Sequence, residues 1–228
     1  MKNIKYSVKC ITMGSGLEVL CRKLKSLNGI EIIDKNGLDE DVWKNVDLGF
    51  IIADDVDDDE LEAVLRNAGK YAKNVFTIAI SDKGIMGNFL SINPSEFKND
   101  DMYDYIINAV ESIIGEVGLP GEVSLDIDDF SNLFSINHQI SFTYGEAAGD
   151  KVLVEITRCV IDKNKLDLSK ADYIIYSAVS GKNNIELHEI DEVIKMLKRG
   201  SNSDTNIIYG FRMDKNLGDN VKVFIWSA

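Results

Sequence analysis

A run of six carboxylates directly follows an apolar segment in the first third of the chain. The apolar segment covers Leu48 to Ala53, and the acidic run covers Asp54 to Glu60 with Val56 as its one apolar member. In a doubly wound α/β domain, glycine amides and a helix N-terminus hold phosphates at the turn between a strand end and the next helix. Because negative charges repel a triphosphate, we expect this turn to serve something other than nucleotide binding.

The same carboxylates have two further interpretations. Asp55, Asp57 and Asp59 have the spacing that opens a calcium-binding EF-hand loop, since Mg²⁺ and Ca²⁺ prefer oxygen ligands. Such a loop has glycine at its sixth position and glutamate at its twelfth, whereas this chain has Glu60 and Arg66 there. Carboxylates at a helix start also cap free backbone N–H groups and complement the helix dipole. We therefore expect a solvated helix start and no metal site.

The composition of the chain limits the classes of function that the protein can have. The net charge of -13 argues against a nucleic-acid or anionic-membrane partner, because both require a basic face. The sequence has no signal peptide and no apolar run long enough to span a membrane, so we expect a cytoplasmic protein. Neither His138 nor His188 has a carboxylate, serine or cysteine at motif spacing, which argues against an independent hydrolase.

The acidic run must be positioned by an alternation of strands and helices. Strands are predicted at 5–13, 30–33, 47–53 and 75–80, and helices at 17–27 and 59–72. The turn Gly14-Ser15-Gly16 follows the first strand. This alternation predicts an α/β fold with a small Rossmann-like parallel sheet over residues 1–100.

A second region follows a long helix. Asn99 to Val117 has the spacing of one broad apolar face, and Pro120 ends it. Beyond it, helices are predicted at 126–134, 149–160 and 187–197, and strands at 139–144, 173–178, 207–211 and 221–226. We therefore expect three parts: a truncated Rossmann-like N-terminal domain over 1–100, a central spine helix over 101–118, and a smaller α/β C-terminal domain over 119–228.

Four segments, in this order, resemble the FtsZ/tubulin superfamily, and FtsZ more closely than eukaryotic tubulin. They are Leu119 to Phe130 (the synergy loop and the following helix), Tyr144 to Gly149 (a small-residue turn), Leu168 to Ile175 with Glu186 to Leu197 (a strand and a helix), and Asn206 to Gly210 with Asp219 to Val223 (a closing hairpin). The resemblance covers residues 101–228 in register and implies a C-terminal domain of the FtsZ/tubulin type.

The resemblance of the N-terminal half is only in outline. Gly14, Ser15 and Gly16 resemble a shortened remnant of the family's phosphate loop, which we expect to be inactive. The family's second glycine-rich phosphate motif falls where this chain has its acidic run. Two like charges about 4 Å apart repel by roughly 4 kcal/mol near a protein surface, so several such contacts would cancel a micromolar affinity of about 8 kcal/mol. The short connection from Ile33 to Asp47 and the region from Lys83 to Pro94 leave little chain for loops that hold base and sugar.

The synergy loop keeps its acidic positions. In the family, an asparagine and two aspartates of this loop enter the nucleotide site of the next subunit. Here Ser124 replaces the asparagine, while Asp126 and Asp129 stand at the acidic positions. The resemblance implies that this pair could polarise water in a neighbour's site. The alternative is that Asp126 is an N-cap and Asp129 its first-turn partner.

These features lead to one expectation and two alternatives. We expect a degenerate FtsZ-like protein that binds no cofactor, is not itself a GTPase, and acts on a cytoskeletal filament in cell division. Its partner would be an FtsZ-like subunit or a second copy of itself, and since the last strand directly precedes Ala228, no direct membrane binding is expected. One alternative is a polymerising GTPase that binds GTP through Mg²⁺; the other is a relative in fold alone.

Overall fold

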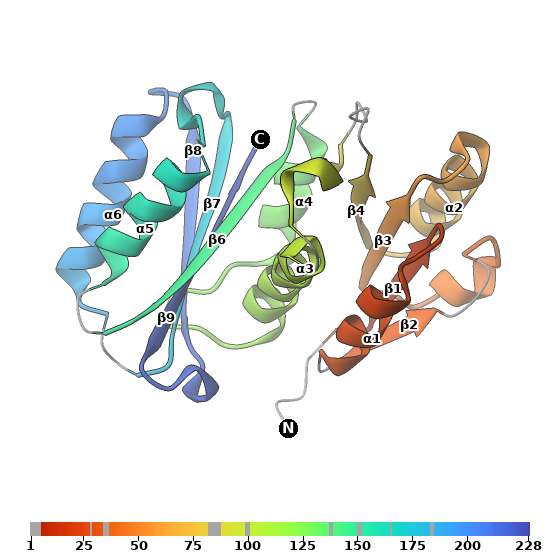
Figure 1. Ribbon diagram of the computed structural model, residues 1–228, viewed down its shortest axis with the longest axis horizontal. Coiled ribbons are helices and arrows are strands. Elements are labelled where there is room, and N and C mark those ends of the chain that lie inside the picture. The colour runs from red at the N-terminus through yellow and green to blue at the C-terminus, as the bar shows by residue number, and fades with distance from the viewer. Residues whose placement is uncertain are drawn as a thin grey trace. The chain divides into compact units, whose positions relative to one another are not determined.

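The computed structural model describes residues 6–27, 29–33, 37–81, 88–98, 101–136, 139–149, 152–164, 166–182 and 185–228. The chain forms two compact units, and the division between them falls between Glu111 and Ser112, inside one helix. Each unit is built on its own β-sheet with helices packed against it (Figure 1).

The first unit contains a five-stranded sheet of parallel strands in the order β2-β1-β3-β4-β5. Its elements are β1 (Val8–Met13), α1 (Glu18–Ser26), β2 (Ile30–Ile33), the short 3₁₀ helix η1 (Glu40–Trp43), β3 (Leu48–Asp54), α2 (Asp58–Tyr71), β4 (Asn74–Ile80), β5 (Leu90–Ile92), the 3₁₀ helix η2 (Pro94–Glu96) and the beginning of α3 (Asp101–Gly118). The predicted Rossmann-like parallel sheet is confirmed, with β5 as an additional edge strand.

Helices cover the two faces of this sheet. Successive side chains of a strand point to opposite faces, so the uninterrupted burial of β3 means that both faces are covered. Ile51 and Ala53 belong to the core shared with Val64 and Ala68 of α2. This double coverage explains why the β3 segment is apolar throughout without alternation.

The second unit contains a four-stranded sheet in the order β6-β9-β7-β8. Its elements are the end of α3, α4 (Ile127–Ser135), β6 (Ser141–Ala148), α5 (Leu153–Lys163), the 3₁₀ helix η3 (Leu168–Lys170), β7 (Tyr173–Ser180), α6 (Leu187–Gly200), β8 (Asn206–Met213), the 3₁₀ helix η4 (Lys215–Leu217) and β9 (Asn220–Ser227). Strand β9 is antiparallel to both β6 and β7, whereas β7 and β8 are parallel.

Two helical layers enclose the second sheet. Helices α5 and α6 cover one face, where Ile156, Val193 and Leu197 share a core with the strands (Figure 1). The other face carries α4 and the end of α3: the indole Nε1 of Trp226 donates a hydrogen bond to Ser112 Oγ at 3.0 Å. The rings of Phe130 and Phe134 on α4 also pack against Trp226.

The structure corrects two details of the expected C-terminal region. Tyr144 to Gly149 is not a turn before a helix, because β6 continues to Ala148 and pairs with β9 along its whole length. The small residues serve packing instead: a Cβ on Gly145 would overlap Val160 of α5, so glycine allows the helix to approach the strand. The expected closing hairpin is also wrong, because β7 lies between β8 and β9.

None of the helices in the described part of the chain is both long and apolar enough to cross a lipid bilayer.

Candidate functional site

The first candidate site is the carboxyl end of the parallel sheet, where the strand order reverses. Strands β1 and β3 are neighbours, yet the chain proceeds from β1 outward to β2 and from β3 outward to β4. Ligands of open α/β sheets bind in the crevice at such a switch point. The Gly14-Ser15-Gly16 turn follows β1 and the acidic run begins at the end of β3, and the pairing of Met13 with Ala53 brings both to the same edge.

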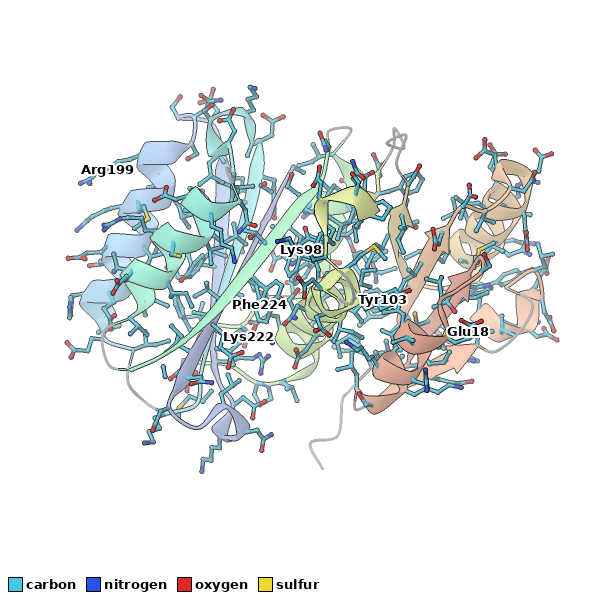
Figure 2. All side chains as sticks on the ribbon, viewed as in Figure 1. Glu18, Lys98, Tyr103, Arg199, Lys222 and Phe224 are labelled. Carbon is cyan, nitrogen blue, oxygen red and sulfur yellow. The ribbon has the colours of Figure 1, made fainter. Side chains whose placement is uncertain are left out.

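The glycine turn is packed closely on the end of β3. Gly14 has a φ of +108°, and a Cβ added there would overlap the carbonyl oxygen of Asp54. Gly16 has a φ of +86°, and its carbonyl accepts a hydrogen bond of 3.1 Å from the hydroxyl of Tyr103 on α3. Tyr103 is labelled in Figure 2. Both glycines are therefore explained by backbone conformation, and Gly14 also by a close approach of two backbones.

The helix after this turn begins without a side-chain cap. Leu17 is the N-cap residue of α1, and its side chain makes no capping hydrogen bond. Ser15 lies exposed in the preceding turn, and Glu18 adds a negative charge in the first helical turn. The backbone thus keeps one feature of a phosphate site, although Glu18 opposes it.

The helix after β3 begins very differently. Asp57 is the N-cap of α2, and its Oδ1 accepts hydrogen bonds from the amides of Asp59 at 3.0 Å and Glu60 at 3.4 Å. Asp58, Asp59 and Glu60 are exposed in the first helical turn. The amides that could hold a phosphate already have an acceptor, and three further charges surround them. Among the described residues, no group of three or more His, Cys, Asp or Glu side chains is placed to hold a metal ion.

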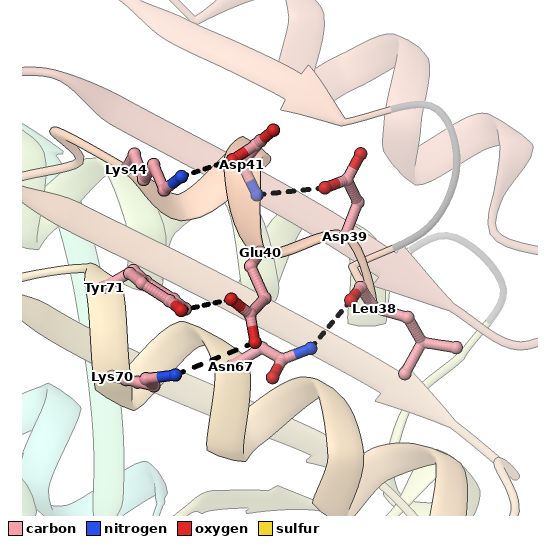
Figure 3. A network of polar contacts seen from close by, with 8 residues as sticks. All are labelled: Leu38, Asp39, Glu40, Asp41, Lys44, Asn67, Lys70 and Tyr71. Atoms are coloured by element: carbon pink, nitrogen blue, oxygen red, sulfur yellow. Dashed lines mark hydrogen bonds and ion pairs between the residues drawn. The ribbon is translucent and has the colours of Figure 1, made fainter.

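The short connection between β2 and β3 is fastened to α2, as far as residues 37–47 describe it. Asn67 donates to the carbonyl of Leu38 at 2.7 Å, and the hydroxyl of Tyr71 donates to the carboxylate of Glu40 (Figure 3). The indole of the fully buried Trp43 donates to the carbonyl of Gly37 at 2.9 Å. Asn67 and Tyr71 lie in the C-terminal half of α2, which is the half farther from the acidic first turn. The rest of this connection, 34–36, and residues 83–87 of the region 83–94 lie outside the described residues.

The second candidate site is the beginning of α4. The amide of Asp129 donates to Asp126 Oδ1 at 3.0 Å, and the amide of Asp126 donates to Asp129 Oδ2 at 2.9 Å. This reciprocal pair is a capping box, which satisfies two backbone donors at once. Ser124 lies exposed in the loop before it, with its hydroxyl near the backbone of Gly121. The structure brings Asp126 and Asp129 together, and both serve the helix start.

The environment of Asp129 extends to the start of β7. Partial burial raises the pKa of the Asp129 carboxyl, and Asp126 and Asp128 raise it further, against the lowering effect of the amide of Asp126. Burial also raises the pKa of the Tyr173 hydroxyl, with Asp129 adding to the effect and a hydrogen bond with Asn132 opposing it. Sequence reasoning missed Asn132 and Tyr173. The available signal was that Asn132 stands three residues after Asp129 on one helix face.

The two histidines add no catalytic group that the structure describes. His188 lies exposed at the start of α6, with its Nδ1 3.1 Å from a carboxylate oxygen of Glu186. His138 lies outside the described residues.

Comparison with known proteins assigns the second unit to a family. Residues 140–228 match the C-terminal domain of the FtsZ family. The cell division protein FtsZ of Magnetospirillum gryphiswaldense is 25% identical over 125 residues, which cover 54% of this chain. The matched part spans only 22% of the length of that relative.

Solved structures of low sequence identity share the fold. An FtsZ mutant from M. jannaschii superimposes with a TM-score of 0.66 at 13% identity, covering 97% of this chain and 91% of that one. A GTPγS-bound protofilament of CetZ2 from Haloferax volcanii gives a TM-score of 0.59 at 14% identity, with 96% and 92% coverage. With the sequence matches, they show that residues 140–228 are similar to the C-terminal domain of the FtsZ family and that the chain shares the fold of FtsZ and CetZ, members of the FtsZ/tubulin superfamily.

Proposed function

We propose that this protein neither binds nor hydrolyses GTP by itself and acts on a cytoskeletal filament through a protein partner. The observation that carries the proposal is the beginning of α2. Asp57 occupies the first amides of that helix, and three exposed carboxylates follow it. A phosphate there would have to displace an intramolecular carboxylate and approach the remaining charges, each of which repels it by about 1 to 4 kcal/mol at 4 Å.

The proposed docking surface is the loop that ends in Asp126 and the first turn of α4. Glu122, Val123 and Ser124 are exposed in this loop, so a partner can reach it. We propose that this surface docks on the nucleotide end of an FtsZ-like subunit, or on a second copy of the chain. A solved relative, CetZ2 of Haloferax volcanii, is a GTPγS-bound protofilament. Because the acidic end of this protein holds no nucleotide, the next subunit would not add there, and the filament would be capped or shortened. We further propose that it acts in the cytoplasm, in cell division.

Sedimentation of an FtsZ-like polymer from the same cell tests the role. Polymer yield and GTP turnover are measured with and without an equimolar amount of this protein, and both are expected to fall. The matched control is Asp128→Asn, which lies in the same helical turn but outside the capping box. An Asp126→Asn/Asp129→Asn variant is expected to lose the effect. Unchanged yield and turnover with the parent protein would reject the partner role.

A nucleotide titration tests the loss of GTP binding. Millimolar GTP with Mg²⁺ is expected to leave the melting temperature unchanged, because a ligand raises it only by binding the folded state. A rise of several degrees would contradict the proposal.

The start of α1 favours a second candidate function, a polymerising GTPase with rebuilt phosphate loops. The amides of its first turn follow Gly14-Ser15-Gly16 and have no side-chain cap. In this function Mg²⁺ would bridge phosphate and the acidic run. A nucleotide-induced stabilisation that disappears on removal of Mg²⁺ would favour it over the first proposal.

A further inference from the structure

A buried ion pair joins the end of α3 to the edge strand β8. The Nε of Arg212 lies 2.8 Å from Oε1 of Glu116, and the two side chains are 5% and 1% exposed. The Nη1 of Arg212 also lies 3.7 Å from Oδ2 of Asp214, which is beyond hydrogen-bond distance. Burial raises the pKa of the Glu116 carboxyl, and the adjacent guanidinium opposes that shift. Both residues belong to the second unit.

Two glycines, Gly115 and Gly210, leave space next to this ion pair. A Cβ on Gly115 would lie 2.6 Å from Nη2 of Arg212, so a larger residue at position 115 would require the guanidinium to shift. A Cβ on Gly210 would lie 3.0 Å from Oε2 of Glu116. A buried ion pair adds little net stability compared with apolar residues of similar size, because both charges lose their hydration. Its best-attested contribution is a fixed register between the elements that it joins.

The loop that follows Glu116 runs along the same strand. Val123 and Phe211 exchange two backbone hydrogen bonds, of 3.2 and 2.9 Å. A Cβ on Gly121 would lie 2.6 Å from the carbonyl oxygen of Phe211. The side chain of Leu125 fills the space above Gly210, where an added Cβ would lie 2.8 Å from its Cγ.

Three consecutive residues of β8 therefore hold the segment between α3 and α4. Gly210 contacts Leu125 and Glu116, Phe211 contacts Val123 and Gly121, and Arg212 contacts Glu116. The capping box of Asp126 and Asp129 begins one residue after Leu125. A shift of α3 along β8 would thus be transmitted to the two aspartates through the short loop 119–126.

We propose that the Glu116–Arg212 pair is a positioning device that sets the register of the loop 119–126 on β8 and so presents Asp126 and Asp129 for docking. This inference rests on the proposed function, in which that loop contacts the partner. Arg212 and Glu116 do not touch the partner themselves. Their charges select one register, which apolar side chains of the same volume would not specify.

Replacing both charged residues with apolar ones separates the effect on the register of the loop from the effect on the stability of the protein. In the full chain, Glu116→Leu/Arg212→Met removes both charges and keeps a similar volume, so its melting temperature is expected to stay within about 3 °C of the parent. Glu116→Leu alone leaves Arg212 buried and unpaired and is expected to lower the melting temperature by more than about 5 °C. The double variant therefore tests the loop in a folded protein.

Hydrogen exchange of individual amides reports the register without a partner. In the double variant, the amides of Val123 and Phe211, each of which donates to the carbonyl of the other residue, are expected to exchange at least tenfold faster than in the parent. Amides in the centre of β9 should be unchanged, as should all of these amides in Lys170→Met, which removes an exposed ion pair of the same unit. Unchanged protection of Val123 in the folded double variant would overturn the inference.

Polymer sedimentation then connects the register to docking. The double variant is expected to lose most of the effect of the parent protein on an FtsZ-like polymer, while Lys170→Met keeps it. If the parent has an effect and the double variant retains it in full, the positioning role is wrong. If the parent has no effect, the proposed function fails, and the exchange of Val123 and Phe211 still decides whether the pair sets the register.

Discussion

Helices α2 and α4 both begin with an aspartate N-cap in an acidic sequence, yet the two starts differ in how the carboxylates are used. At α4, Asp126 and Asp129 each accept a backbone N–H, and Asp129 is partly buried. At α2, Asp57 alone accepts two amides, and three more carboxylates stand exposed beside it. Helix capping therefore accounts for the α4 aspartates but not for the surplus charge at α2.

This difference changes what each region can do. Each α4 carboxylate accepts a backbone N–H through one oxygen, Oδ1 of Asp126 and Oδ2 of Asp129, so both shape the helix start. Asp58, Asp59 and Glu60 of α2 do not cap the helix in this way, and their negative charge is the feature that repels an anion. A resemblance in sequence would suggest the reverse, with chemistry at Asp126 and Asp129 and a vestigial loop at the sheet end.

The largest expected effect concerns the glycine turn that packs on the end of β3. Gly14→Ala is expected to cost about 3 kcal/mol or more, because its Cβ would overlap the carbonyl of Asp54 at a positive φ. Gly16→Ala also has a positive φ, but no atom lies within 4 Å of its added Cβ, so about 1 kcal/mol is expected. Urea denaturation measures both. Equal losses would show that the turn does not pack on β3 as described.

The capping box of α4 is expected to rank next. Asp126→Ala and Asp129→Ala should each lower the free energy of unfolding by about 1 to 2 kcal/mol, since each leaves a backbone donor unpaired. A double-mutant cycle should give a coupling of about 0.5 kcal/mol or more, because the two carboxylates act reciprocally. Asp126→Asn retains a capping oxygen and serves as the control. If the losses of unfolding free energy of the two single variants simply add in the double variant, the carboxylates do not act reciprocally. The contrast with α2 would then be wrong.

Removing the surplus charge of α2 should affect stability less. Asp58→Asn/Asp59→Asn/Glu60→Gln keeps Asp57, so the loss should be a few tenths of a kcal/mol per site through the helix dipole. GTP binding, measured by equilibrium dialysis, is expected to stay absent because Asp57 still occupies the first amides. Micromolar binding by this triple variant would mean that charge alone excludes nucleotide.

The smallest effect is expected at the opposite end of β3. A hydrogen bond from Lys73, at 2.6 Å, and one from the amide of Ser7 hold the pKa of Asp47 below its usual value. A lowered folded-state pKa stabilises the protein above the unfolded pKa of about 3.9, and this stabilisation is lost as pH falls through the folded value. Because Lys73 is largely exposed, Asp47→Asn should cost only about 0.5 kcal/mol at pH 7.

Urea titrations of the parent and Asp47→Asn at pH 7 and pH 3 check this last expectation. The difference between the two proteins should shrink at the lower pH, and a difference that grows on acidification would contradict the assignment.

Local patterns predicted most of the elements, and the structure shows why they could. Helix α2 and strand β3 were located to within one residue at each end, because an amphipathic helix and a strand buried on both faces each leave a clear periodicity. Strand β5 has three residues and leaves no such signal.

Features that depend on distant pairs could not be predicted in this way. The contact between Glu116 and Arg212 joins residues 96 positions apart. The insertion of β7 between β8 and β9 depends on pairing in the folded sheet, and the side chain of Tyr173 approaches Asp129 only because α4 lies across that sheet. The sequence therefore pointed to Asp126 and Asp129 as candidate site residues, but it did not predict the contacts that hold them in place.

The position of β9 has a consequence for synthesis. This strand is the last of its sheet to be translated, yet it pairs on both sides, with β6 and with β7. Until residues 220–227 leave the ribosome, β6 has no neighbour, and the apolar faces of α5 and α6 have only part of a sheet to cover. Nascent chains of this half should therefore expose strand edges and be prone to aggregation until β9 has left the ribosome.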